Sequence, residues 1–139
     1  MFSPYRVTRI INFAYGHRLL NYEGKCKNLH GHNGKLEIVL AAPRLDPRGM
    51  VVDFVDIKAK IGRWIDENLD QSMILNRKDP WLKTLRDLDP SVRAVDFNPT
   101  AENLAKMVYD EARRLGFSFL EVRLWETENS CAIYKGRST

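Results

Sequence analysis

The chain has 139 residues, of which 44% are hydrophobic, so residues 1–139 are expected to form a single domain with a buried core. Its net charge of +4 comes from interspersed basic and acidic residues, which argues against a nucleic-acid partner but suits an anionic small-molecule substrate. Two distant cysteines, the absence of an apolar run of roughly 18 residues and the lack of a signal-peptide core in residues 1–9 predict a cytoplasmic protein with no membrane partner.

The first third of the chain predicts two strands joined by a loop. Residues 5–15 mix β-branched and aromatic side chains and indicate a strand. Residues 24–34 contain three glycines and are expected to form a loop. Residues 35–41 predict a second strand that pairs with the first, and residues 43–49 form a turn cluster.

Two amphipathic helices are expected next. Asp53 or Asp56 can cap the first, whose apolar stripe runs to Leu69. Residues 76–98 are polar, interrupted by prolines, and predict irregular structure. Thr100 is a suitable N-cap for the second helix, and Gly116 ends it.

Two further strands are expected over residues 119–125 and 131–134. The resulting order, β-β-α-α-β-β, predicts an α+β fold with a four-stranded, largely antiparallel sheet and two helices on one face. The second face of the sheet and its edges would then need a cover, which sister subunits of a homo-oligomer could supply.

The three histidines of the chain lie within sixteen positions. His30 and His32 are two residues apart, so an extended backbone places both imidazoles on one face. His17 ends the first predicted strand, and a hairpin would bring it close to this pair. Three imidazoles with an open fourth position are typical of catalytic zinc, whereas a His-Gly-His segment alone can also be a polar loop.

Several candidates for chemistry surround this loop. Cys26 lies between Lys25 and Lys27 and is either a base or nucleophile or an unreactive loop cysteine. The two lysines, with Arg18, could neutralise substrate phosphates or could be ordinary surface charge.

Two carboxylates also suggest functional roles. Glu126 shares a strand face with apolar residues, so it needs a partner such as the paired N–H donors of a guanidine-like heterocycle edge. The alternative is a strand-end carboxylate in water. Asp70 lies where the first helix ends, which is electrostatically unfavourable for an acid and hints weakly at another role.

The sequence resembles the 6-pyruvoyltetrahydropterin synthase and 6-carboxytetrahydropterin synthase family in six segments that occur in the same order. The Cys-x-x-x-His-x-His element with an upstream histidine is the most specific of these matches. The segments read FAYGHRL, GKCKNLHGHN, GMVVDF, LD, PTAEN and ET, and lie at residues 13–19, 24–33, 49–54, 69–70, 99–103 and 126–127.

The resemblance implies a tunnelling fold (T-fold) assembled as trimers that stack into hexamers. It implies Zn²⁺ on His17, His30 and His32, and Cys26 as general acid or base. It further implies that Glu126 and Thr127 bind the pterin ring, with Thr100 and Glu102 bordering the pocket.

The family substrate implied is 7,8-dihydroneopterin triphosphate, whose charge suits Lys25 and Lys27. One product branch gives 6-carboxy-5,6,7,8-tetrahydropterin with acetaldehyde and triphosphate, as in queuosine biosynthesis. The other eliminates triphosphate and leaves a 6-pyruvoyl group. The compact loop over residues 23–30 and the short chain favour the first branch.

The sequence departs from the family pattern after the first helix. The family has an Asp-His pair that relays protons, whereas this chain has Asp70 followed by Gln71. A glutamine cannot titrate, although it can orient a substrate or a water. This departure motivates two alternatives: a pterin-binding homologue that has lost catalysis, or an enzyme with an altered preference, such as aldolase-like activity on dihydroneopterin.

Overall fold

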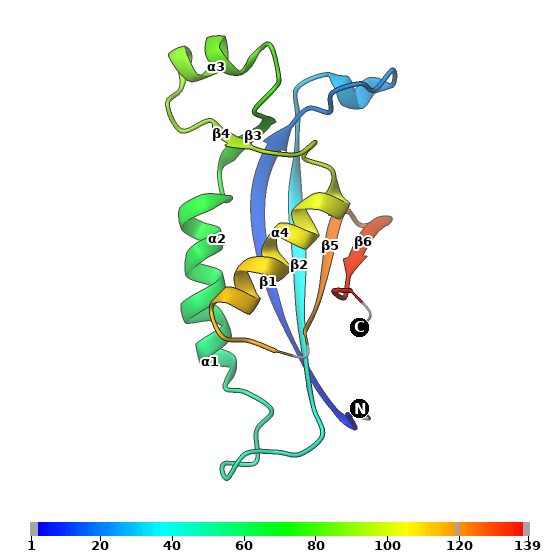
Figure 1. The fold of residues 1–139 in the computed structure, drawn as a ribbon, viewed down its shortest axis with the longest axis vertical. Helices are drawn as coiled ribbons and strands as arrows, with labels where there is room; N and C mark the ends of the chain where they lie inside the picture. The colour runs from blue at the N-terminus through cyan, green and yellow to red at the C-terminus, as the bar shows by residue number, and fades with distance from the viewer. Residues whose placement is uncertain (1–2, 119, 138–139) are drawn as a thin grey trace.

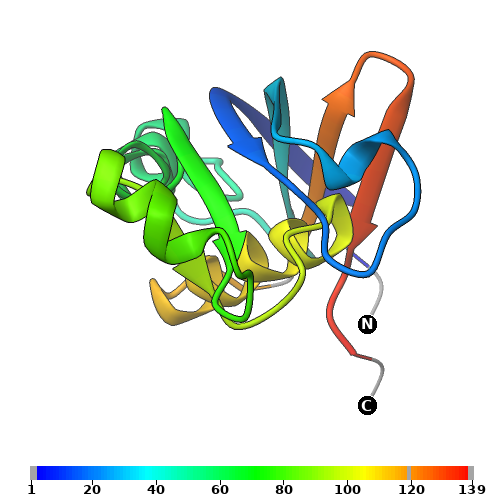
Figure 2. The same ribbon diagram turned by 90° about the horizontal axis from the view of Figure 1, so that it is seen from above.

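A computed structural model describes residues 3–118 and 120–137, and in it six strands form one mixed sheet in the order β4-β3-β1-β2-β5-β6 (Figures 1 and 2). Phe119, predicted to begin the third strand, lies outside the described residues. The strands are β1 (Tyr5–His17), β2 (His30–Ala42), β3 (Ser72–Asn76), β4 (Arg93–Val95), β5 (Leu120–Thr127) and β6 (Ser130–Tyr134).

The α+β class is confirmed, but the predicted sheet of four strands is wrong in number. β3 and β4 add two short strands that pair in parallel, β3 with β1 and β4 with β3. Both are five residues or fewer, too short to show an alternating pattern. The four predicted strands form the antiparallel part, β1-β2-β5-β6.

The long hairpin of β1 and β2 is the centre of the fold. Thirteen residue pairs join these strands, from Tyr5 opposite Ala42 to His17 opposite His30. The predicted loop over residues 24–34 is therefore too long, because β2 begins at His30. Within the connection, η1 (Lys25–Lys27) forms a 3₁₀ turn.

The first predicted helix is a continuous helical stretch of three parts: α1 (Phe54–Ile57), a π-helical segment η2 (Lys58–Gly62) and α2 (Arg63–Asn68). Of its two candidate caps, Asp53 is the one used, since its carboxylate accepts a hydrogen bond from Val55 N–H. The second predicted helix is α4 (Ala101–Arg114), with Thr100 as N-cap and Gly116 at φ +103° after its end. Residues 76–98 are less irregular than predicted, because they contain α3 (Leu82–Leu88) as well as β4.

Both main helices cover the same face of the sheet, as expected (Figure 1). The stripe of Ile57, Ile61, Ile65 and Leu69 and the stripe of α4 belong to one buried cluster with the inner side chains of β1, β2 and β5. None of the helices within residues 3–118 and 120–137 is long and apolar enough to cross a membrane.

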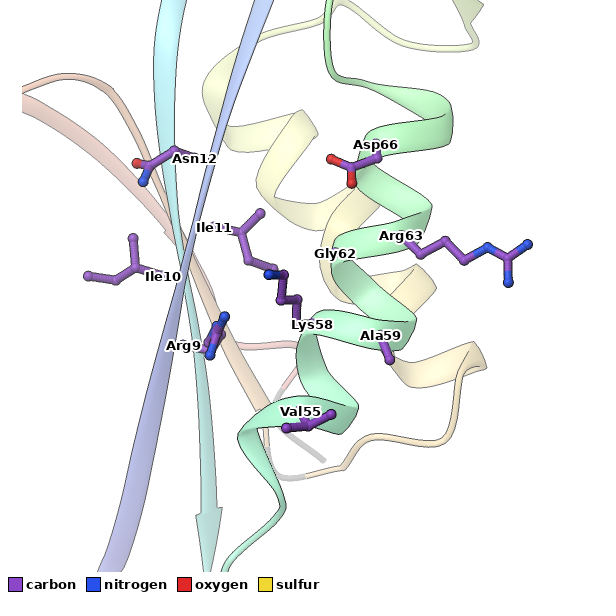
Figure 3. Close-up of a pocket in the computed structure, with 10 residues that line it drawn as sticks. All are labelled: Arg9, Ile10, Ile11, Asn12, Val55, Lys58, Ala59, Gly62, Arg63 and Asp66. Carbon is purple, nitrogen blue, oxygen red and sulfur yellow. The ribbon is translucent and has the colours of Figure 1, made fainter.

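One edge of β1 lies open along most of its length. β3 pairs with Tyr15–His17, so among the described residues the stretch 5–14 pairs with β2 alone. A cavity of about 550 Å³ lies between this edge and the α1–α2 stretch (Figure 3). Ile11, Lys58 and Gly62 are among the residues that line it. An unpaired strand edge of this length is a template for another strand.

Candidate functional site

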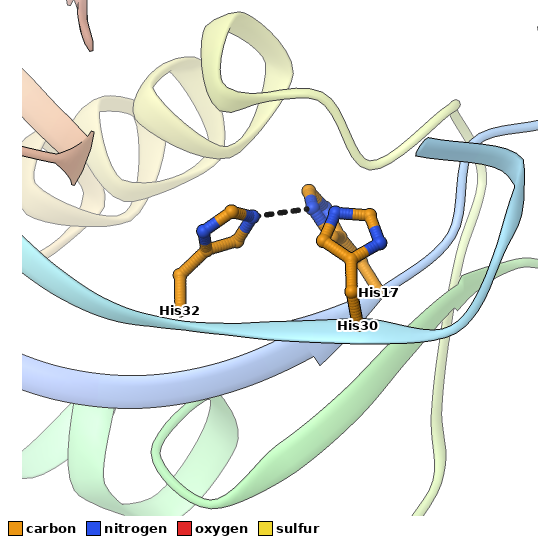
Figure 4. A group of neighbouring side chains, drawn as sticks. All are labelled: His17, His30 and His32. Carbon is orange, nitrogen blue, oxygen red and sulfur yellow. Dashed lines mark hydrogen bonds between the residues drawn. The ribbon is translucent and has the colours of Figure 1, made fainter. Parts of the chain in front are cut away.

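The register of the hairpin places the three histidines together (Figure 4). His17 lies opposite His30 and Tyr15 lies opposite His32, so all four rings project from the same face of the sheet. One ligand nitrogen from each histidine lies within 4.8 Å of the others. The predicted convergence of the imidazoles is therefore present in the structure.

Backbone carbonyls fix two of the rings. His17 Nδ1 lies 2.6 Å from the carbonyl oxygen of Pro99, and His30 Nδ1 lies 2.7 Å from that of Asn28. A neutral imidazole that donates its Nδ1–H keeps a lone pair on Nε2. Both rings can therefore offer Nε2 to a metal.

The donor set fits a tetrahedral zinc ion. Nε2 of His17 and Nε2 of His32 are 3.2 Å apart. Two nitrogens at the usual zinc distance in a tetrahedron are separated by about 3.3 Å. The three imidazole nitrogens therefore match the ligand set of a three-histidine zinc centre.

His17 is the most enclosed of the three, with 2% of its surface exposed. Burial lowers the pKa of His17 below its ordinary value of 6.5, against a smaller opposing effect of the Pro99 carbonyl and Glu126. A neutral imidazole is the form that binds metal, so the lowered pKa favours the form of His17 that can act as a ligand.

Glu126 lies beside the histidine cluster. Its Oε1 is 3.6 Å from His17 Nε2 and 3.9 Å from His32 Nε2, and it accepts a hydrogen bond of 3.2 Å from the Tyr15 hydroxyl. Burial, reinforced by the Glu126 carboxylate, raises the pKa of Tyr15, so this hydroxyl stays protonated and donates. The Glu126 side chain is a quarter exposed, so its carboxylate can contact both the histidine cluster and a ligand that enters from solvent.

Cys26 lies in η1, close in the chain to the histidines but outside the cluster of ligand atoms. The N–H of Leu19, two residues after His17, donates to the Cys26 carbonyl at 2.9 Å. This bond ties η1 to the end of β1. Cys26 is partly exposed, and Lys25 and Lys27 on either side are exposed.

Arg18 has a structural environment that sequence reasoning missed. Its Nε donates to Asp79 Oδ2 at 2.6 Å, its Nη1 donates to the Lys27 carbonyl at 3.2 Å, and its guanidinium lies 3.6 Å from the centre of the Trp81 ring. Both members of this ion pair are buried. Its charge is therefore already paired within the chain, whereas Lys25 and Lys27 form no ion pair with residues 3–118 or 120–137.

Asp70 and Gln71 lie beside β1, where Gln71 N–H donates to the Ala14 carbonyl. Asp70 Oδ1 accepts a hydrogen bond from Ala14 N–H, and Gln71 has a left-handed backbone with φ +61°. Gln71 borders a cavity of about 500 Å³ that is also lined by His30, Gly31, His32 and Asn33 of β2. Asp70 is not part of the histidine cluster, whereas Gln71 shares the lining of this cavity with two of its members.

The remaining predicted residues lie at the start of α4 and at the end of β5. Thr100 is held as a cap, with its Oγ1 accepting from Asn103 N–H, and Glu102 is exposed in the first turn of α4. Thr127 accepts from Asn129 N–H in the β5–β6 turn, next to a β-bulge between Trp125 and Thr127.

The mixed sheet, the two covering helices and the three-histidine centre define a protein of the T-fold class. The chain belongs to the 6-pyruvoyl tetrahydropterin synthase family, whose sequence profile matches residues 6–137. It is 39% identical to 6-carboxy-5,6,7,8-tetrahydropterin synthase of Rickettsia bellii, covering 89% of this chain and 95% of that one. It is 31% identical to 6-pyruvoyl tetrahydrobiopterin synthase of Homo sapiens, covering 94% and 91%.

A solved structure shares the fold. The 6-pyruvoyl tetrahydropterin synthase of Caenorhabditis elegans superimposes with a TM-score of 0.69 at 26% identity, covering 99% of this chain and 100% of that one. The resemblance stated from the six motif segments is thereby confirmed.

Proposed function

We propose that this protein is a zinc-dependent lyase that uses water to convert 7,8-dihydroneopterin triphosphate into 6-carboxy-5,6,7,8-tetrahydropterin, acetaldehyde and triphosphate. The observation that supports this most is the convergence of His17, His30 and His32 beside Glu126. The name of the Rickettsia relative favours this product.

The three imidazoles would hold the zinc ion through Nε2 of His17 and matching nitrogens of the other two rings. Zinc at such a site supplies Lewis acidity, which lowers the pKa of a bound hydroxyl. The carbonyls of Pro99 and Asn28 keep His17 and His30 oriented for that role.

The other side chains bind and move protons in this proposal. Glu126 accepts two parallel hydrogen bonds from the amino-pyrimidine edge of the pterin, while Tyr15 fixes the orientation of its carboxylate. Cys26 removes and returns protons at the ring and side-chain carbons. Lys25 and Lys27 attract the triphosphate, and Thr100, Glu102 and Thr127 border the pocket.

We further propose that the site is completed by a second copy of the chain in a trimer that stacks into a hexamer. The open edge of β1 offers a pairing surface, and Gln71 lies at a cavity beside that strand. Asp70 and Gln71 of one subunit would then approach the centre of the next.

Two alternatives are tied to specific features. The human relative is named for the 6-pyruvoyl product, which makes triphosphate elimination the second candidate reaction. Gln71, which cannot titrate, favours a pterin-binding homologue without turnover as the third.

Product analysis separates these candidates. Zinc-loaded protein is incubated with 7,8-dihydroneopterin triphosphate, and the products are identified by mass spectrometry, with acetaldehyde trapped as a hydrazone. 6-Carboxytetrahydropterin with acetaldehyde is expected. A 6-pyruvoyl product would support the second candidate, and pterin binding without product would support the third. His30→Ala, which removes one ligand, is expected to lose stoichiometric zinc and all product.

A further inference from the structure

The hydrogen bond that orients His17 depends on a carbonyl far along the chain. Pro99 lies 82 residues after His17, and its carbonyl oxygen approaches Nδ1 at 2.6 Å in a buried environment. A histidine ligand is normally held by such an outer partner, which sets both its tautomer and the direction of its metal-binding nitrogen. The position of the Pro99 carbonyl therefore determines how His17 presents its Nε2 to the proposed metal ion.

Asn98 fixes this carbonyl relative to β1. The N–H of Leu20 donates to Asn98 Oδ1 at 2.8 Å, and Asn98 Nδ2 donates to the Leu20 carbonyl at 3.2 Å. The side-chain amide therefore pairs with Leu20 as a peptide group would pair in a strand. Leu20 comes three residues after His17, so the two chain segments are joined directly beside the His17–Pro99 contact.

The backbone of Asn98 holds the other side of the same junction. Its carbonyl accepts hydrogen bonds from Thr100 N–H at 2.8 Å and from Asn103 Nδ2 at 2.9 Å. Thr100 and Asn103 form the cap and first turn of α4. Asn98 thus links the segment after β1 to the start of α4. Pro99 follows Asn98 directly and precedes the N-cap Thr100, so both sets of bonds restrict its position.

We infer that Asn98 is a positioning residue for the metal centre, which it orients through the Pro99 carbonyl and the His17 ring. The inference rests on the proposed zinc site, but it concerns a residue that touches neither metal nor substrate. Loss of the two bonds to Leu20 frees the 98–100 segment to move away from β1, and the His17 ring then loses its fixed partner. Outer partners of this kind contribute about 10- to 100-fold to metal affinity.

The test is a zinc titration of the full chain at one fixed pH in competition with a chromophoric chelator. Asn98→Ala is expected to bind zinc about 10- to 100-fold more weakly than the unsubstituted protein. Its Co²⁺ derivative is expected to show an altered visible spectrum, which a purely structural role would leave unchanged. Circular dichroism confirms that the variant is folded.

The matched control is Asp96→Asn. Asp96 lies two residues earlier in the same connection, is exposed, and pairs with Arg77 on the surface at 2.7 Å. Its substitution is expected to leave the zinc affinity unchanged. If Asn98→Ala does not fold, Asn98→Asp is measured instead, because it keeps an acceptor for Leu20 N–H but places a carboxylate oxygen, which cannot donate, against the Leu20 carbonyl. It is likewise expected to bind zinc more weakly.

The outcomes separate this inference from the proposed function. A folded Asn98 variant with the zinc affinity of the unsubstituted protein would overturn the inference alone. Failure of the unsubstituted protein to bind one zinc ion per chain would overturn the proposed metal centre and the inference with it.

Discussion

His17 is almost fully buried, yet one of its ring nitrogens faces the other two histidines. Its surface is 2% exposed, and its Nδ1 is engaged by Pro99, so a single nitrogen is available to the centre. Burial disfavours the charged imidazolium because the interior solvates it poorly. The residue is therefore kept in its ligand form, and the same effect makes the stability of the protein depend on pH.

Metal-free protein is expected to lose stability as the pH falls below 6.5. Because burial lowers the pKa of His17 in the folded state from its ordinary 6.5, the unfolded chain takes up a proton there before the folded chain does. Stability rises with pH wherever the unfolded state binds more protons, so the free energy of unfolding decreases from pH 6.5 down to the lowered pKa. Urea unfolding across this range measures it. His17→Gln should flatten the slope, and an unchanged slope would contradict the prediction.

Cys26→Ala is expected to lower turnover by about 100-fold or more, the usual scale for a proton-transfer group, while leaving zinc content and circular dichroism unchanged. Steady-state rates and metal analysis measure both effects. Cys131→Ala is the control, because Cys131 lies on β6 and is partly buried there. Normal turnover in Cys26→Ala would remove this thiol from the mechanism.

The sequence predicted the convergence of the three histidines, which lie close together in the chain. Spacing alone placed His30 and His32 on one face, and strand alternation placed Glu126 on a face with apolar residues while leaving open whether it met solvent. The contributions of Pro99 and Asn98 were missed because a backbone carbonyl leaves no mark on composition or periodicity. Their partners lie 82 and 78 residues away, beyond any local pattern.

At the scale of elements, Arg18 joins three segments of the chain. It follows β1 directly, contacts the carbonyl of Lys27 in η1, and pairs with Asp79 in the connection between β3 and α3. Asp79 Oδ1 in turn accepts a hydrogen bond from Trp81 N–H. The turn that carries Cys26 is thereby fixed to the arginine that follows His17.

Arg18→Met is expected to destabilise the protein by about 3 kcal/mol, because it leaves the buried Asp79 carboxylate without its partner. Denaturant unfolding measures the change. In a double-mutant cycle, Asp79→Asn combined with Arg18→Met should cost less than the sum of the two single substitutions. An additive result would show that the two side chains do not interact.

The elements that sequence patterns identified are those with a long apolar stripe. α4 and the α1–α2 stretch each bury one face, and β1, β2 and β5 alternate over many residues. α3 buries none of its side chains fully and so shows no stripe. β3 and β4 depend on pairing with strands that are distant in sequence, which a local window cannot detect.

At the scale of the whole molecule, Gln71 lies beside the edge of β1, and it lines one cavity together with His30 and His32. The three imidazoles project from the face of β1 and β2 that carries the core side chains. The histidines and a glutamine can act on one substrate if a neighbouring copy presents its own Gln71. The importance of Gln71 for turnover can be tested directly.

Gln71→His is expected to raise turnover or leave it unchanged, because histidine adds a titratable group and tolerates the left-handed backbone at φ +61°. Steady-state kinetics measure the effect. Gln71→Asn is the matched control, since it also tolerates this conformation but cannot transfer a proton. A sharp loss of activity in Gln71→His would show that the glutamine has a role of its own.

The location of all three imidazoles on the β1–β2 hairpin has a consequence for biogenesis. Residues 17–32 supply every nitrogen of the cluster, so a nascent chain holds the full set once its first hairpin has left the ribosome. The carbonyl of Pro99 is synthesised much later, and the contact it makes closes a loop of 82 residues. In the proposed metal centre, the ligand nitrogens and the carbonyl that orients the first of them are therefore supplied by parts of the chain that are synthesised at different times.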